Sequence, residues 1–156
     1  MSANRSIAAG AALLLVGSLA PMLAAPPQRD AERGVRRTLI RLNQLLADRD
    51  PAIVDEFVDS PDTLLVGSLA NDRARGRAEL EAHFRGYFER PDTLSFAWRE
   101  VDVAVRGAVA WLHAEGEVIV HGEGGDKRGP YRLTAVLELH AGKWLWRLFH
   151  GSQPAG

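Results

Sequence analysis

The chain has 156 residues, no cysteine, and a formal net charge of −1 from 19 basic and 20 acidic residues. The lack of cysteine excludes disulfides, thiol chemistry and a lipid-modified cysteine anchor. The near-neutral charge argues against a surface that follows nucleic-acid phosphates, and the length fits a single domain.

The N-terminal segment has the pattern of a secretory signal peptide. A positive start with Arg5 precedes an apolar run from Ile7 to Ala20, and Pro21 with the small residues after it forms a cleavage zone. The run is too short to span a bilayer comfortably. We therefore expect a signal peptide over residues 1–25, a mature domain over 26–156, and a periplasmic or secreted protein without membrane attachment. An uncleaved N-terminal anchor is the alternative.

Three helical segments follow. The first carries apolar residues at helical spacing, namely Val35, Leu39, Leu42 and Leu46. A short second helix starts at Pro51, with Asp50 as its N-cap, and reaches Val58. The third covers Gly76–Arg90 and has an aromatic stripe. The residues 71–76 before it are predicted to form a polar loop.

The rest of the chain alternates as β-strands do. The expected strands are Leu64–Ser68, Leu94–Val105, Val109–His121, Tyr131–His140 and Lys143–His150. Because the helices come first and a meandering sheet follows, the pattern predicts an α+β fold.

Alternation also predicts which side chains point inward. In the strand from Leu94, the apolar residues occupy even positions before Arg99 and Glu100 and odd positions after them. This change predicts a β-bulge that bends the strand. In the last strand, alternation places four residues on one inward face, namely Trp144, Trp146, Leu148 and His150. The opposite face of the sheet mixes aromatic and charged side chains: Trp111, His113, Arg132 and Glu138. Such a face suits contact between two copies of the chain.

Three stretches resemble a known family: Leu65–Leu80, Gly107–Trp111 and Gly142–Ser152. With the order of elements, they resemble the SnoaL-like branch of the nuclear-transport-factor-2-like superfamily. The resemblance implies a cone-shaped domain with a curled mixed or antiparallel sheet on about three N-terminal helices, a pocket between them, and a homodimer formed through the sheet. Members include isomerases, cyclases, dehydratases and association domains. Relatives often carry two histidines before the final serine, whereas here Leu148 takes the first position and His150 the second.

Several aromatic residues are expected to line an apolar, ligand-binding cavity, because each lies on an inward stripe: Phe84, Tyr87, Trp98, Tyr131 and Trp146. The alternative is that they fill the core. His150 is the catalytic candidate, because a neutral imidazole shuttles protons near pH 7. A bond from His150 to a backbone group beside Ser152 is the structural alternative.

One strand face carries His113, Glu115, Glu117 and His121. Residues at i and i+2 in a strand lie about 7 Å apart, which is too far for neighbours to share one zinc ion. We therefore expect no metal site and no cofactor.

Three functions remain open from the sequence. The first is an exported pocket domain that binds a small, largely apolar ligand. The second is an acid/base enzyme of isomerase, cyclase or dehydratase type, with His150 and a carboxylate such as Asp102. The third is a non-catalytic, homo-oligomeric association module that uses the outer face of the sheet.

Overall fold

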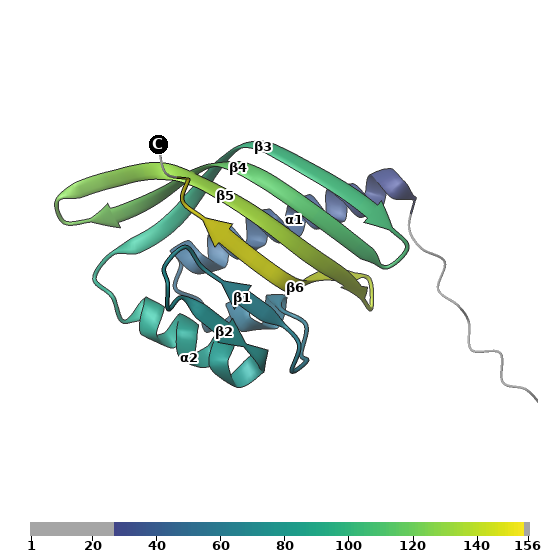
Figure 1. Ribbon diagram of the computed structural model, residues 1–156, viewed down its shortest axis with the longest axis horizontal. Helices are drawn as coiled ribbons and strands as arrows, with labels where there is room; N and C mark the ends of the chain where they lie inside the picture. The colour runs from purple at the N-terminus through teal and green to yellow at the C-terminus, as the bar shows by residue number, and fades with distance from the viewer. Residues whose placement is uncertain (1–26, 155–156) are drawn as a thin grey trace, which may run out of the picture.

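The computed structural model describes residues 27–154, so the predicted signal peptide lies outside the described residues. They form helices packed against one curled sheet (Figure 1). No helix in this part of the chain has both the length and the hydropathy needed to cross a bilayer.

Two α-helices confirm the first and third predicted segments. α1 spans Gln28–Ala47 and α2 spans Gly76–Phe88. The predicted apolar stripe of α1 is buried along its whole length, at Val35, Leu39, Leu42 and Leu46. On α2, Leu80 and Phe84 are buried, and the aromatic stripe continues to the half-buried Tyr87. Both helices therefore bury one face and expose the other.

The middle helix is shorter than predicted. It is a 3-10 helix, η1, over Pro51–Glu56. The predicted cap is confirmed, because Asp50 accepts a hydrogen bond from the Ala52 N–H at 2.9 Å. Phe57 is already extended and forms a β-bridge with Trp146, so the prediction of a helix up to Val58 is wrong. Pairing with the sheet ends the helix early.

Six strands form one mixed sheet in the order β2-β1-β6-β5-β4-β3. Their bounds are Leu64–Val66 (β1), Arg73–Arg75 (β2), Thr93–Arg106 (β3), Val109–Gly122 (β4), Gly125–His140 (β5) and Lys143–Ser152 (β6). β1 runs parallel to β6, and all other neighbours are antiparallel. The predicted α+β class with a curled mixed sheet is confirmed.

β2 corrects the prediction of a loop over residues 71–76. This strand has only three residues, of which Arg73 and Arg75 are exposed and Ala74 is buried. A strand this short shows no apolar alternation in the sequence. It pairs with β1, and that pairing fixes the loop between them.

The long strands β3 to β6 curl across α1, while α2 lies beside the short strands β1 and β2 (Figure 1). The helix approaches the sheet closely at Gly34, where a Cβ atom would lie 2.7 Å from Cδ1 of Trp144. Trp146 is fully buried in the same core. The curl leaves room for side chains between the sheet and the helices, and the candidate site lies there.

The predicted bulge in β3 is confirmed. Trp98 pairs with Gly116 and Glu100 with Glu115, so Arg99 is the extra residue. The opposite strand carries a glycine at this point for a steric reason. A Cβ atom on Gly116 would lie 2.1 Å from the carbonyl oxygen of Ala97.

Replacing Gly116 by alanine is expected to lower the free energy of unfolding by about 1–3 kcal/mol, because the methyl group must displace the backbone of β3. Urea denaturation followed by tryptophan fluorescence measures the change. The matched control is Gly122→Ala in the same strand, where no atom of residues 27–154 lies within 4 Å of the new methyl group. Equal stability of the two variants would contradict the steric argument.

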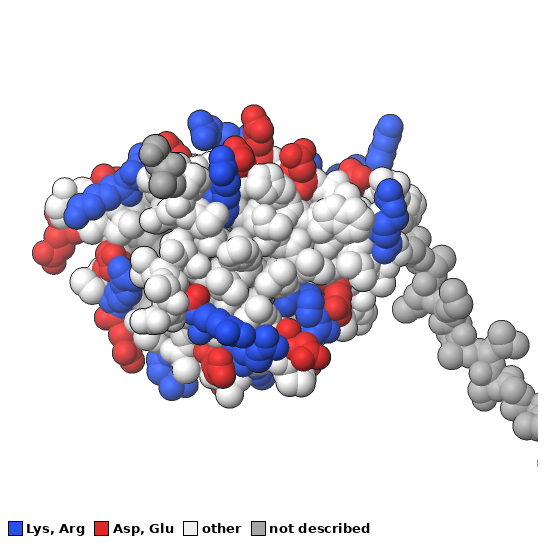
Figure 2. All heavy atoms as spheres, viewed as in Figure 1, with Lys and Arg blue, Asp and Glu red and all other residues white. Residues whose placement is uncertain are grey.

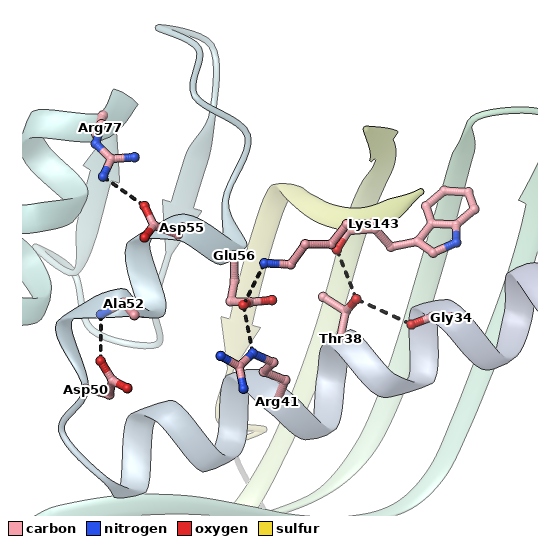
Figure 3. A network of polar contacts seen from close by, with 10 residues as sticks. Gly34, Thr38, Arg41, Asp50, Ala52, Asp55, Glu56, Arg77 and Lys143 are labelled. Carbon is pink, nitrogen blue, oxygen red and sulfur yellow. Dashed lines mark hydrogen bonds and ion pairs between the residues drawn. The ribbon is translucent and has the colours of Figure 1, made fainter. Parts of the chain in front are cut away.

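A buried carboxylate joins η1, α1 and β6. Oε1 of Glu56 accepts hydrogen bonds from Nε of Arg41 at 3.1 Å and from Nζ of Lys143 at 2.9 Å (Figure 3). The Glu56 side chain is 2% exposed, whereas those of Arg41 and Lys143 are 55% and 49% exposed. The two cations reach in from the surface to neutralise a charge that the core has removed from water.

Candidate functional site

A cavity of about 70 Å³ lies between the helices and the inner face of the sheet. Most of its wall is apolar, and these side chains come from α1, η1, the strands and the segments that join them: Leu42, Leu46, Ile53, Phe57, Leu65, Leu94, Phe96 and Phe149. The polar part of the wall comes from Asp72, His83, Tyr87 and Tyr131. The side chains of Asp72 and His83 are partly exposed, at 29% and 20%.

Asp72 and His83 form the ionisable pair of this wall. Nδ1 of His83 lies 3.5 Å from Oδ1 of Asp72. Asp72 belongs to the loop between β1 and β2, which the Gly67 N–H closes by donating to the carbonyl oxygen of Asp72 at 2.6 Å. A Cβ atom on Gly67 would overlap the Asp72 carboxylate, at 1.6 Å from Oδ2. Glycine at position 67 therefore makes room for the carboxylate.

The ring of His83 is held by its neighbours on α2. It meets Phe84 edge to face, with ring centroids 5.2 Å apart, and stacks on Tyr87 at 6.5 Å. Burial lowers the pKa of His83, and the negative charge of Asp72 opposes this effect. The imidazole is therefore neutral at pH 7, with one ring nitrogen free to accept a proton.

The two tyrosines of the wall keep their protons. Burial, with a smaller contribution from the charge of Asp72, raises the pKa of Tyr131 to about 12. Burial also raises the pKa of Tyr87. A phenol that stays protonated donates a hydrogen bond to an oxygen of a bound molecule. The wall thus combines one proton acceptor, one carboxylate and two O–H donors around an apolar space.

The structure brings together three of the five aromatic residues predicted to line a cavity, namely Phe84, Tyr87 and Tyr131. Trp146 is instead fully buried in the core. Trp98 does not line this cavity, and its ring packs on Phe96 and Tyr131 with centroids 5.1 and 6.2 Å apart. Phe96 lines the cavity in place of Trp98.

The predicted inward orientation of His150 is wrong. β6 contains a bulge of its own, because Val136 pairs with Leu148 and Leu137 with Trp146, which leaves Arg147 as the extra residue. The bulge reverses the alternation, so Phe149 is buried and His150 is exposed on the outer face. His150 lies away from the cavity, where it pairs with Thr134.

The predicted pair of His150 and Asp102 does not form a common site either. Across the outer face, Asp102 pairs with His113, His113 with Thr134, and Thr134 with His150. Two strands therefore separate the two side chains, which corresponds to about 14 Å between their backbones. No proton passes directly over that distance.

The sequence prediction missed Asp72 and His83. His83 carried a usable signal, because it follows Leu80 by three residues and precedes Tyr87 by four, on the apolar stripe of α2. A titratable residue on such a stripe points toward the core. Asp72 carried no such signal, since it lies among other polar residues of a loop whose shape depends on β2.

The remaining histidines of the predicted polar strand face have partners on the surface. His113 contacts Glu115 at 3.4 Å, and His121 contacts Asp126 at 2.8 Å. Among residues 27–154, no three or more His, Cys, Asp or Glu side chains gather in a way that could hold a metal ion.

Comparison with known proteins supports one family. A family model described as a SnoaL-like domain matches residues 35–156. No curated protein matches the sequence. A protein of unknown function from Pseudomonas putida, described as nuclear-transport-factor-2-like, has 21% identity and a TM-score of 0.68 over 82% of this chain and 89% of its own.

Two further solved structures share the fold. One, from Streptomyces avermitilis, is provisionally assigned as a dehydratase of the same family, with 14% identity and a TM-score of 0.73 over 82% of this chain and 99% of its own. The other, from Catenulispora acidiphila, was solved in complex with S-DNPA, with 18% identity and a TM-score of 0.70 over 81% of this chain and 95% of its own. At these identities the likeness concerns the fold alone.

Proposed function

Because the chain belongs to the SnoaL-like domain family of the nuclear-transport-factor-2-like superfamily, we propose that its cavity binds a small, largely apolar substrate and that His83 transfers a proton there. The observation that carries the proposal is the Asp72–His83 pair in the wall of an otherwise apolar cavity. A titratable pair that faces an apolar pocket is a common mark of acid/base sites.

The proposed chemistry assigns each polar group one role. Neutral His83 removes a proton from the substrate, and the carboxylate of Asp72 stabilises the imidazolium that forms. Tyr87 and Tyr131 donate hydrogen bonds to the oxygen on which negative charge develops. These roles fit the removal of a proton next to a carbonyl group, as in an isomerisation or a dehydration. The relative from Streptomyces avermitilis, provisionally assigned as a dehydratase, agrees with this class.

The size of the cavity limits the substrate. Ligand pockets usually enclose about 300–1,000 Å³, whereas this cavity encloses about 70 Å³. Only the reacting end of a substrate fits inside, and the remainder lies outside the cavity. A small ketone with one apolar arm has the required shape.

The exchange of carbon-bound hydrogen tests the proposal without knowledge of the natural substrate. Small apolar ketones are incubated with the protein in D₂O, and proton NMR follows the loss of the signal next to the carbonyl group. We expect exchange that saturates with ketone concentration and that exceeds the rate in buffer. Exchange at the buffer rate for a ketone that NMR shows to be bound would refute proton transfer but not binding.

We also propose that two copies of the chain associate through the outer face of the sheet. One apolar row crosses five strands in register: Ala104, Trp111, Val136, Leu148 and Leu64. Trp111 is 48% exposed in the described chain. Figure 2, which views this face, shows an area without charged side chains over the middle of the sheet. An exposed apolar area of this kind favours contact with another protein surface.

Replacing Trp111 by aspartate is expected to shift the protein from dimer to monomer, because the dimer would bury an unpaired charge at its centre. Light scattering coupled to size exclusion measures the mass. The matched control is Leu69→Asp, which introduces the same charge at an apolar residue that is 67% exposed in the loop between β1 and β2, outside the apolar row. A wild type that is already monomeric, or an unchanged mass for the Trp111 variant, would contradict the proposed interface.

Export remains a prediction that rests on residues 1–25.

A further inference from the structure

Three polar side chains meet at one end of the sheet, away from the cavity. Ser95 of β3, His121 of β4 and Asp126 of β5 lie on three adjacent strands. Oγ of Ser95 lies 2.8 Å from Nε2 of His121, and Nδ1 of the same ring lies 2.8 Å from Oδ1 of Asp126. The two ring nitrogens therefore have different partners, a hydroxyl and a carboxylate.

The carboxylate decides where the proton of the imidazole lies. Asp126 accepts but does not donate hydrogen bonds when ionised, so Nδ1 of neutral His121 must carry the proton. Nε2 is then unprotonated and accepts the hydrogen bond from the Ser95 hydroxyl. This is the arrangement in which a histidine acts as general base toward a serine, with the carboxylate orienting the ring.

Strand pairing holds the three residues in place. His121 pairs directly with Asp126 on one side and with Thr93 on the other, and Ser95 pairs with Ile119 two residues along. All three side chains leave the sheet on its outer face, because Phe96, the neighbour of Ser95, points into the cavity on the inner face. The His121 side chain is 40% exposed, so a small molecule can reach the cluster from solvent.

We propose that Ser95 is a nucleophile, activated by His121 and Asp126, that accepts the acyl group of small esters. Oγ of Ser95 attacks the ester carbonyl carbon while its proton passes to Nε2 of His121. The bond from that carbon to the leaving oxygen breaks, and the imidazolium returns the proton to the leaving alcohol. Water then attacks the acyl-serine by the same route, which yields the free acid and restores the serine.

The size of the expected effect follows from the strand position of Ser95. The Phe96 N–H donates to Oδ1 of Asn43 on α1 at 2.7 Å, so it points away from β4. In an antiparallel pair the neighbouring N–H of Ser95 then points toward β4 and belongs to the ladder. It does not stabilise an oxyanion, so the acceleration is that of general-base assistance alone, of which we expect at least about tenfold.

The first test uses p-nitrophenyl acetate with the wild type, Ser95→Ala and Ser152→Ala. Absorbance follows release of the phenol, and peptide mass spectrometry locates the acetyl group. We expect acetylation at Ser95 and a rate at least about tenfold lower for Ser95→Ala. Ser152→Ala, a control at another serine of the sheet, should react as the wild type does. Equal rates for the wild type and Ser95→Ala, or acetyl groups only at other residues, would overturn the proposal.

A second test measures activation directly, because the chain has no cysteine and a new thiol is unique. The variants Ser95→Cys and Ser152→Cys are alkylated with iodoacetamide near neutral pH, and mass spectrometry follows the reaction. We expect the thiol at position 95 to react at least about tenfold faster, since an adjacent imidazole favours the thiolate. Adding His121→Gln should remove that advantage. Equal rates at the two positions would show that the cluster is only a surface hydrogen-bond network.

Discussion

Replacing both Arg41 and Lys143 by methionine is expected to lower the free energy of unfolding by about 3–5 kcal/mol, because Glu56 then stays buried without a counter-charge. The Glu56 side chain is 2% exposed, and among residues 27–154 only Arg41 and Lys143 form ion pairs with it, both through Oε1. Oε2 has no hydrogen-bond partner among the described residues. Methionine keeps the apolar stem of each side chain and removes only the charge. Chemical denaturation measures the loss.

Removing the charge of Glu56 itself should lower the free energy of unfolding much less. Glu56→Gln removes the buried charge and leaves two cations that solvent already reaches, since Arg41 and Lys143 are about half exposed. We expect a loss of about 1 kcal/mol or less. The triple variant that combines Glu56→Gln with both methionines should recover most of the stability lost by the double variant. No recovery would show that the methionines act through packing and not through the unpaired carboxylate.

A neighbouring ion pair provides a matched control. Asp55, next to Glu56 on η1, pairs with Arg77 at 2.9 Å, but the Asp55 side chain is 62% exposed (Figure 3). Solvent screens a pair of this kind, so Arg77→Met should leave the stability almost unchanged. A loss as large as that of the double variant would contradict the role of burial.

Replacing His83 by glutamine is expected to lower the rate of hydrogen exchange in a bound ketone by about 10²–10⁴-fold, the usual contribution of a general base. Glutamine keeps the size and polarity of the side chain but accepts no proton near pH 7. The NMR assay in D₂O measures the rate. The control is His140→Gln, because His140 also contacts a carboxylate, Glu138 at 3.0 Å, but lies on the surface.

The pH profile of the same reaction tests the role of Asp72. The rate should rise with pH as His83 loses its proton, and because burial lowers the pKa of His83 the rise should lie below the ordinary histidine value of about 6.5. The charge of Asp72 opposes that lowering, so Asp72→Asn should move the rise to still lower pH. The rate above the rise should also fall, because the imidazolium is no longer stabilised. An unchanged profile would remove Asp72 from the mechanism.

One β-bulge could be predicted from the sequence and the other could not. In β3 the apolar residues change from Phe96 and Trp98 to Val101 and Val103, so the reversal is visible in the pattern. In β6 apolar side chains point to both faces of the sheet: Leu145 and Leu148 face outward, and Trp146 and Phe149 face inward. The pattern of apolar residues therefore does not show which face is buried. Arg147 is the extra residue at the reversal, but its polar side chain also fits an outward position of an unbroken strand, so it does not reveal the bulge. The orientation of His150 depended on that bulge, which is why its prediction was wrong.

The sequence by itself determined the α+β class, the amphipathic faces of α1 and α2, and three aromatic residues of the cavity wall, because these follow from periodicity along one element. Only the tertiary structure decided which ionisable groups meet. Asp72 reaches His83 because β2 pairs with β1 and fixes the loop against α2. Likewise, Ser95, His121 and Asp126 meet only through the register of three strands. Such contacts depend on the pairing of distant segments, which periodicity within one segment does not encode.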